Sequence, residues 1–208
     1  FFATPASALA SILGALALVA LIVFWKSLLW LFGVIIVPDD SLGTVTKKFV
    51  LLGSKRNLPD GQIIALEGEA GFQADTLSPG LHMGLWPWQY TIALIKFTKI
   101  PQGKIGVVQA CDGKPLPSGR VIARDIDCDF FQDARAFLKT GGERGPQMKV
   151  VPPGTYRINP LLFTVTLHDA TEIPPGKLGV VEAHDGNPLP IGRVIAKGVN
   201  CDSYQDAR

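Results

Sequence analysis

The chain lacks the motifs by which most enzymes are recognised. It has no Gly-x-Ser-x-Gly, no glycine-rich phosphate loop ahead of Lys-Ser/Thr and no His-Glu-x-x-His. Those motifs mark serine hydrolases, nucleotide-binding proteins and zinc peptidases. We therefore predict that this chain is not an enzyme, and we expect neither catalytic residues nor a cofactor.

Metal ligands and basic clusters are scarce as well. His82, His168 and His184 are the only histidines, and none stands at metal-ligand spacing from a cysteine or a carboxylate, so we expect no metal site. The formal net charge is +2, and the densest basic group has four members: Lys47, Lys48, Lys55 and Arg56. Nucleic-acid-binding proteins concentrate positive charge on one surface, so we expect no nucleic-acid partner.

One long apolar run occupies the amino terminus, where Lys26 is the only charged side chain from Phe1 to Pro38. About 20 apolar residues in a helix cross a bilayer, so the sequence predicts a transmembrane helix over about 4–31. Trp25 and Trp30 are expected at the membrane interface, with Lys26 reaching toward the headgroups. The alternative is a cleaved signal peptide, although its apolar region is usually shorter and follows basic residues.

Two further features of this segment concern orientation and packing. Basic residues follow the helix and none precedes it in the visible sequence, so the rest of a single-pass cell-membrane protein is expected in the cytoplasm. Ala6, Ala10 and Gly14 recur at every fourth position on one face, a pattern by which membrane helices pack closely. Alanines that merely face lipid are the alternative.

The remainder of the chain is repetitive. The pattern Leu-Pro-x-Gly-(Arg/Gln)-(Val/Ile)-Ile-Ala occurs at 58–65, 116–123 and 189–196. Copies two and three keep one constant spacing at every anchor, whereas loops of the first copy differ in length. A unit repeated along the chain is typical of proteins in which each unit packs on its neighbour. Such an organisation favours assembly over a single catalytic cleft.

The repeat divides the chain into an anchor at 1–32, a first module at 33–99, a second at 100–172 and a third at 173–208. The third copy stops before its own Pro-Pro-Gly element, so we expect a truncated module within a fragment of a longer protein.

Short apolar runs bounded by turn signals predict mainly β modules. Strands are expected at 105–108, 121–123 and 161–167, and the Asp-Gly pairs at 112–113 and 185–186 predict hairpin-type turns in which glycine supplies a positive φ. Each copy is also expected to open with a proline turn and a short strand.

One stretch of the modules, 132–139, has the pattern of an amphipathic helix, and Gly141 follows it as a stop signal. The predicted fold class is therefore an N-terminal transmembrane α-helix followed by tandem mainly β (α+β) modules.

Few side chains are candidates for a subunit interface. Arg120 and Arg193 share a repeat position, where a guanidinium can bind lipid phosphate or a carboxylate of another subunit. Asp133 and Arg135 belong to a Gln-Asp-Ala-Arg motif that recurs at 205–208. The simpler alternatives are a solvated strand arginine or local ion pair for the first set, and an aspartate at a helix N-terminus for the second.

Trp86 and Trp88 lie beside a Pro-Gly turn of the first module. Their amphipathic rings suit either the membrane interface, which we expect, or the core of the module.

Cysteine use points away from a disulfide framework. The three cysteines, Cys111, Cys128 and Cys201, are odd in number, and the last two share a repeat position. We expect all three to be buried small apolar side chains in a reducing compartment.

The order of these elements resembles the SPFH (band 7) superfamily, which includes stomatin, prohibitin and flotillin. The resemblance is carried by an apolar anchor, then Val-Pro-Asp-Asp-Ser-Leu-Gly-Thr-Val at 37–45, then Leu-Ser-Pro-Gly-Leu-His-Met-Gly-Leu-Trp-Pro at 77–87. It covers about residues 33–99 and is echoed to the end of the chain. The tandem modules are most similar to bacterial flotillin-like proteins, but the chain departs from the usual pattern because no coiled coil is visible.

The resemblance implies a homo-oligomeric ring or cage that acts as a scaffold on a membrane, contacts lipid and organises a microdomain. A docking or regulatory module for a membrane protease or transporter is the alternative. An enzyme whose catalytic domain follows the visible chain is a third hypothesis, which the residues neither support nor exclude.

Overall fold

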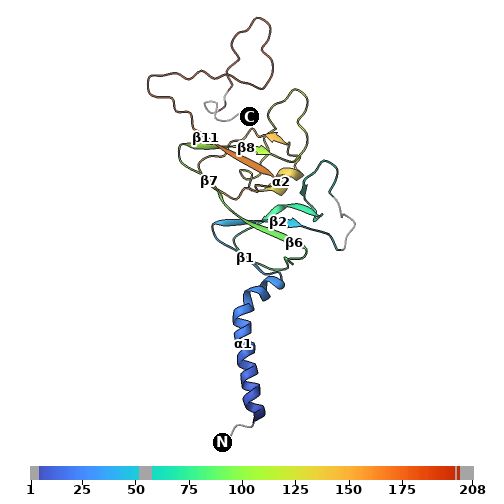
Figure 1. Ribbon diagram of the computed structural model, residues 1–208. Helices are drawn as coiled ribbons and strands as arrows, with labels where there is room; N and C mark the ends of the chain where they lie inside the picture. The colour runs from blue at the N-terminus through green and yellow to red at the C-terminus, as the bar shows by residue number, and fades with distance from the viewer. Residues whose placement is uncertain (1–4, 52–57, 200, 202–208) are drawn as a thin grey trace.

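The computed structural model describes residues 5–51, 58–199 and 201, except for the side chains of residues 5–8, 26, 28 and 30. In Figure 1 a helix projects from two stacked β modules, and an extended segment loops out beyond them. Secondary structure follows that order along the chain.

Helix α1 (Pro5–Leu31) is rich in alanine, leucine, isoleucine and valine. Among the residues that the structure describes, no helix has both the length and the apolar character that a membrane crossing requires. The predicted transmembrane anchor at 1–32 is therefore wrong, as are the fold class that began with it and the single-pass location with cytoplasmic modules.

The first module is an antiparallel sheet with one short parallel strand. Its strands pair in the order β3-β4-β2-β6, while β1 and β5 form a separate pair. The strands are β1 (Ile35–Val37), β2 (Ser41–Lys47), β3 (Ile64–Ala65), β4 (Gly71–Leu77), β5 (Gly80–His82) and β6 (Tyr90–Lys96).

The second module repeats this arrangement. Its strands pair in the order β11-β8-β9, while β7 and β10 form a separate pair. The elements are β7 (Thr98–Ile100), β8 (Lys104–Ala110), α2 (Ala134–Lys139), β9 (Gly145–Pro146), β10 (Gly154–Tyr156) and β11 (Phe163–Asp169).

Each module consists of two halves that are distant in sequence. The long strand β2 of the first half pairs with β6 of the second half, and β8 pairs with β11 in the same antiparallel sense. We call 35–66 and 98–124 the first halves, and 69–96 and 143–169 the second halves. Neither half forms its sheet alone, because every long strand has its partner in the other half.

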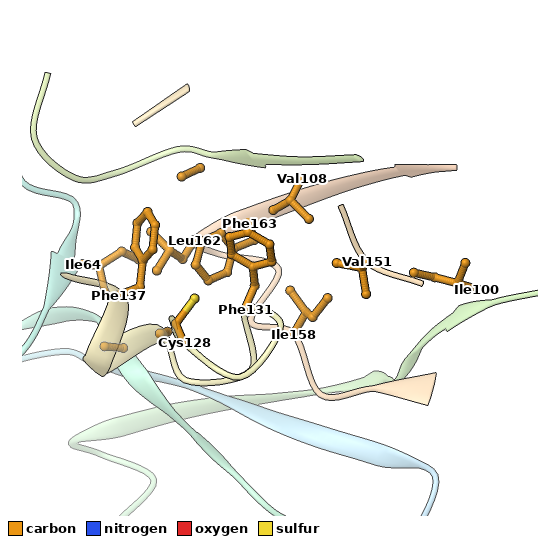
Figure 2. Close-up of a cluster of buried hydrophobic side chains, with 13 residues drawn as sticks. Ile64, Ile100, Val108, Cys128, Phe131, Phe137, Val151, Ile158, Leu162 and Phe163 are labelled. Carbon is orange, nitrogen blue, oxygen red and sulfur yellow. The ribbon is translucent and has the colours of Figure 1, made fainter. Parts of the chain in front are cut away.

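The core lies mainly in the second module (Figure 2). Phe163 meets Phe131 and Phe137 edge-on, with ring centroids 5.2 and 5.0 Å apart. Helix α2 contributes Phe137, which is fully buried. The helix predicted at 132–139 is confirmed over Ala134–Lys139. Thr140 is its C-cap, and Gly141 follows with a φ of +88°, the left-handed conformation that glycine favours.

The third copy differs from the other two. The structure places no strand in 171–199, so the strand predicted at the start of this copy is wrong. The strand predicted at 121–123 is also wrong, since only Ala123 makes a bridge there, to Gln147. A strand requires a pairing partner, and no residue described beyond 171 supplies a second half for the third copy.

Candidate assembly site

The two modules are joined through a buried aspartate. Asp112 follows β8, and its Oδ2 accepts hydrogen bonds from the backbone N–H groups of Ile63 and Ile64, both at 2.7 Å. Its Oδ1 accepts a third from Gly113, also at 2.7 Å. The residue is 3% exposed, so the three donors replace the water that the carboxylate loses. Asp112 thus ties the second module to the Ile-Ile segment of the first.

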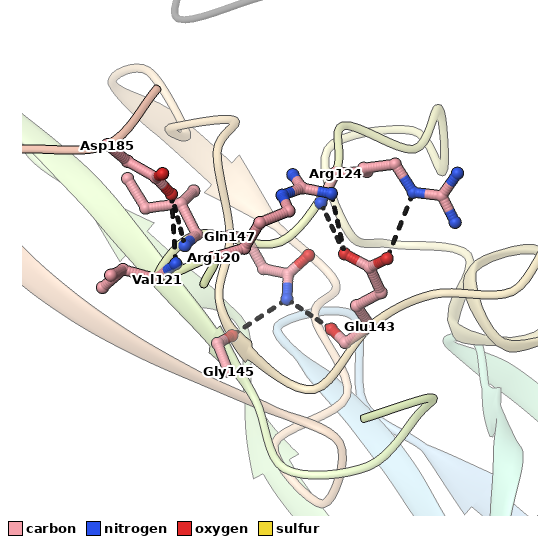
Figure 3. A network of polar contacts seen from close by, with 8 residues as sticks. Arg120, Val121, Arg124, Glu143, Gly145, Gln147 and Asp185 are labelled. Carbon is pink, nitrogen blue, oxygen red and sulfur yellow. Dashed lines mark hydrogen bonds and ion pairs between the residues drawn. The ribbon is translucent and has the colours of Figure 1, made fainter. Parts of the chain in front are cut away.

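The same contact recurs one repeat later. Asp185 is the third-copy equivalent of Asp112, and its Oδ2 accepts hydrogen bonds from the backbone N–H groups of Val121 and Ile122, both at 3.1 Å (Figure 3). Its Oδ1 accepts one from Gly186 at 2.8 Å. The Val121 N–H is the main cause that lowers the pKa of Asp185, followed by the other two donors. We call this arrangement the inter-module carboxylate contact.

The Asp-Gly turns have the backbone that the sequence predicted. Gly113 has φ +132° and Gly186 has φ +129°. An added Cβ at Gly113 would collide with the carbonyl oxygen of Gly142, whereas none of the described atoms lies within 4 Å of one at Gly186. The two turns therefore share a conformation but differ in what surrounds them.

A second carboxylate contact joins the two halves of the second module. Glu143 is almost fully buried, and its Oε2 accepts a hydrogen bond from the Arg124 backbone N–H at 2.9 Å. The Arg124 Nε donates to Oε1 at 3.1 Å, and Arg120 Nη1 lies 3.7 Å from Oε2 (Figure 3). The Arg124 backbone N–H is the main cause that lowers the pKa of Glu143. In the first module, buried Glu69 accepts the Glu67 N–H at 2.8 Å.

A glutamine completes this motif. Gln147 Nε2 donates to the carbonyls of Glu143 and Gly145, at 2.8 and 2.9 Å. Gln73 Nε2 donates to Glu69 and Gly71 at 2.8 and 3.0 Å, so the two glutamines make the same contacts.

Each glutamine also pairs with the first half. Gln73 is the parallel partner of Ala65, and Gln147 that of Ala123. We call 69–73 and 143–147 the Glu-x-Gly-x-Gln segments. Sequence analysis missed them, although the shared pattern is visible in the sequence at both places.

The predicted interface residues of the second module are engaged within this chain. Arg120 contacts Glu143, as described. Arg135 forms an ion pair with Asp75 of the first module, with Nε donating to Oδ1 at 2.8 Å, and this hydrogen bond is the main cause that raises the pKa of Arg135. Asp133 accepts the Ala136 N–H at 2.8 Å and is the N-cap of α2, which was the simpler alternative.

Arg193 differs from these three. It is exposed, and within the described part of the chain no carboxylate lies at ion-pair distance from it. Its place in the repeat makes it the third-copy equivalent of Arg120, which contacts a buried glutamate.

The residues predicted for the anchor are placed only in part. The side chains of Ala6, Lys26 and Trp30 lie outside the described residues. Ala10, Gly14 and Trp25 are exposed on α1.

Trp86 and Trp88 stack on each other with ring centroids 4.8 Å apart. Trp88 is 49% exposed, so it does not fill the core of the first module.

The cysteines do not share one environment. Cys128 is buried, and desolvation raises its pKa to about 11. Cys201 is half-buried and Cys111 is exposed, so the prediction that all three are buried holds fully only for Cys128. Among the described residues no group of three or more histidine, cysteine or acidic side chains is placed to hold a metal ion.

A cleft of about 420 Å³ lies between β4 and α2, where Asp75 and Arg135 meet. Neither histidine nor cysteine lines it, and its Arg135 is already paired. The cleft therefore lies where β4 of the first module meets α2 of the second.

Comparison of the chain with protein-family models, with curated proteins and with solved structures finds no match.

Proposed function

We propose that this chain is a non-enzymatic assembly scaffold, made of β modules joined in series, that associates with other polypeptide chains, copies of itself included. The observation that carries the proposal is the inter-module carboxylate contact, which is made twice, at equivalent positions of successive copies. A contact that is reused between successive units is how repeat proteins extend, since each unit binds only its neighbours. Membership of the SPFH superfamily stays a prediction, on which this proposal does not depend.

The third copy supplies the surface for association. Leu178 and Val180 are 97% and 98% exposed, and Ile195 is 82% exposed. Extended backbone and large apolar side chains in one segment form a surface that another polypeptide can cover by strand pairing. Self-association through this segment is expected to be reversible and dependent on concentration.

Sedimentation velocity on the full chain tests the proposal. The parent is expected to exceed its monomer mass of 22.3 kDa increasingly as concentration rises. Val180→Asp is expected to shift this equilibrium toward monomer, because a charge cannot be buried in an apolar contact without a large cost.

Thr171→Asp is the matched control, since it adds the same charge to an exposed residue just before the repeat. Both variants retain α1, so any association through that helix is common to them. A parent chain that stays monomeric at every concentration, or equal behaviour of the two variants, overturns the proposal.

A further inference from the structure

We propose that the third copy is a preformed first half whose partner is a second-half segment from outside residues 1–208, recognised by a Glu-x-Gly-x-Gln sequence followed by a Pro-Gly turn and an apolar strand. The inference deepens the proposed function and rests on one part of it, namely that another polypeptide segment pairs with the third copy.

The turns of the third copy already have the geometry of a paired first half. Lys177 N–H donates to Pro174 at 3.1 Å, as Lys104 N–H donates to Pro101 at 3.2 Å in the second module. The glycines before these lysines have φ of +82° and +78°.

The Leu-Pro-x-Gly turn is matched in the same way. Arg193 N–H donates to Pro190 at 3.1 Å, and Arg120 N–H donates to Pro117 at 3.2 Å. The turns of the third copy therefore form without a strand partner.

Packing inside the segment agrees with this. A Cβ placed on Gly106 would lie 2.7 Å from Cδ1 of Ile100, and one on Gly179 would lie 2.6 Å from Cδ1 of Ile173. The isoleucine thus covers the glycine in both copies. The turn and the isoleucine–glycine contact of 100–106 are therefore present in 173–179 without a strand partner, so binding does not have to order them.

The third copy lacks the paired segment that would bury its apolar side chains. Val108 is completely buried, because β8 is paired with β11, whereas its equivalent Val181 is 58% exposed. Ile100 is 3% exposed and its equivalent Ile173 is 56% exposed. The segment that buries these positions in the second module is the second half, 143–169.

The polar groups indicate the same partner. In the second module the Arg124 backbone N–H and the Arg120 guanidinium contact the Glu143 carboxylate. Their equivalents in the third copy are Lys197 and Arg193, which are both exposed. A glutamate presented beside Ala196 would find the same two donors.

The repeats of residues 1–208 contain no second half that is free to pair with the third copy. The repeats provide three first halves, at 35–66, 98–124 and 173–197, but only two second halves, at 69–96 and 143–169. Exchange between copies of this chain preserves that imbalance, so one first half per chain always stays open. Full cover requires an additional second-half segment.

The test uses the full chain and a fluorescent synthetic peptide with the sequence of residues 142–170, which serves as a surrogate second half. Anisotropy is expected to show saturable binding with one peptide per chain. Hydrogen exchange is expected to slow at 177–182 and 193–197 in the complex, because their backbone N–H groups acquire strand or carboxylate acceptors. Excess peptide is also expected to shift self-association toward monomer.

Matched variants locate the site. Val180→Asp in the chain is expected to abolish binding, and Thr171→Asp to leave it unchanged. A peptide with Glu143→Gln is expected to bind about tenfold more weakly, since it loses a charge-assisted hydrogen bond. Arg193→Glu is expected to weaken binding of the parent peptide and to restore part of the affinity for a peptide with Glu143→Arg.

The outcomes separate the two proposals. Self-association without peptide binding overturns this inference and leaves the proposed function standing. Peptide binding by a chain that never self-associates supports the inference and overturns the self-association part of the proposed function. Binding that is insensitive to Val180→Asp and Arg193→Glu, with exchange changes confined to 98–124, means that the peptide displaces the chain's own second half, and it overturns the inference.

Discussion

The carboxylate of Asp112 accepts the backbone N–H of Ile64, which belongs to the preceding module, at 2.7 Å in a buried setting. A single side chain thereby links the start of β3 in the first module to the turn that follows β8 in the second. Because Asp185 makes the same contact with Val121 and Ile122, the connection between modules is a property of the repeat.

Removal of the Asp112 carboxylate is expected to destabilise the chain. Asp112→Ala leaves the Ile63 and Ile64 N–H groups without their acceptor, and buried unsatisfied donors cost about 1 to 3 kcal/mol. We expect a loss of about 2 to 3 kcal/mol in the free energy of unfolding, measured by urea denaturation. Asp60→Ala, at an exposed aspartate, is the control and should leave the midpoint close to the parent's. An equal effect of the two substitutions would contradict the assigned role.

The two Asp-Gly turns allow backbone strain to be separated from steric collision. Gly113→Ala and Gly186→Ala impose the same unfavourable φ, but only the first meets the Gly142 carbonyl. We expect Gly113→Ala to cost about 1 to 3 kcal/mol more in the free energy of unfolding than Gly186→Ala. Thermal and urea denaturation of the two variants provide the comparison. Similar losses would show that the backbone around Gly142 shifts to accommodate the added methyl group without a loss of stability.

The modules show what local sequence can predict. The helix at 132–139 was predictable because its signals, an aspartate cap and a terminal glycine, lie close together in the sequence. The positive φ of the Asp-Gly turns was predictable for the same reason.

The absence of strands from 171–199 was not predictable from the same signals. Ile100–Val108 and its equivalent at 173–181 are nearly the same sequence, but only the first is opposite a second half, which lies much further along the chain. Strand formation depends on that distant partner, so similar sequences differ in structure.

Arg120 illustrates a second limit. Its recurrence at Arg193 made it an interface candidate, but its partner Glu143 belongs to a Glu-x-Gly-x-Gln segment, which does not occur in the described part of the third copy. The local ion pair was among the alternatives, and identifying it required the fold.

The pH dependence of the inter-module contact follows from Asp185. Its pKa is lowered chiefly by the Val121 N–H, so the folded state binds this proton more weakly than the unfolded state. The resulting stability is present above the ordinary aspartate pKa of about 3.9 and is lost as pH falls through the lower folded value.

Amide hydrogen exchange of Val121 and Ile122, followed between neutral and acidic pH, measures this. Protection at both amides, corrected for intrinsic exchange rates, is expected to persist to about pH 4 and to fall below it. In Asp185→Asn the protection should be low and should not titrate over this range. Protection in the parent that is independent of pH would contradict the contact.

The cysteines should differ sharply in reactivity, because the thiolate is the reacting form. Burial raises the pKa of Cys128 to about 11, so at pH 7 only about one such thiol in ten thousand is ionised. Cys111 is exposed and open to reagent. In a time course with a chromogenic disulfide, we expect Cys111 to react first and Cys128 only at the rate of unfolding.

Single substitutions identify the phases of that reaction that belong to Cys111 and to Cys128. Cys111→Ser should remove the fast phase that belongs to this residue and leave the slow phase intact, whereas Cys128→Ser should do the reverse. Because Cys128 reports opening of the second module's core, the slow rate should rise in Asp112→Ala if the inter-module contact stabilises that core. An unchanged slow rate would show that Asp112 stabilises the first module but not the core of the second.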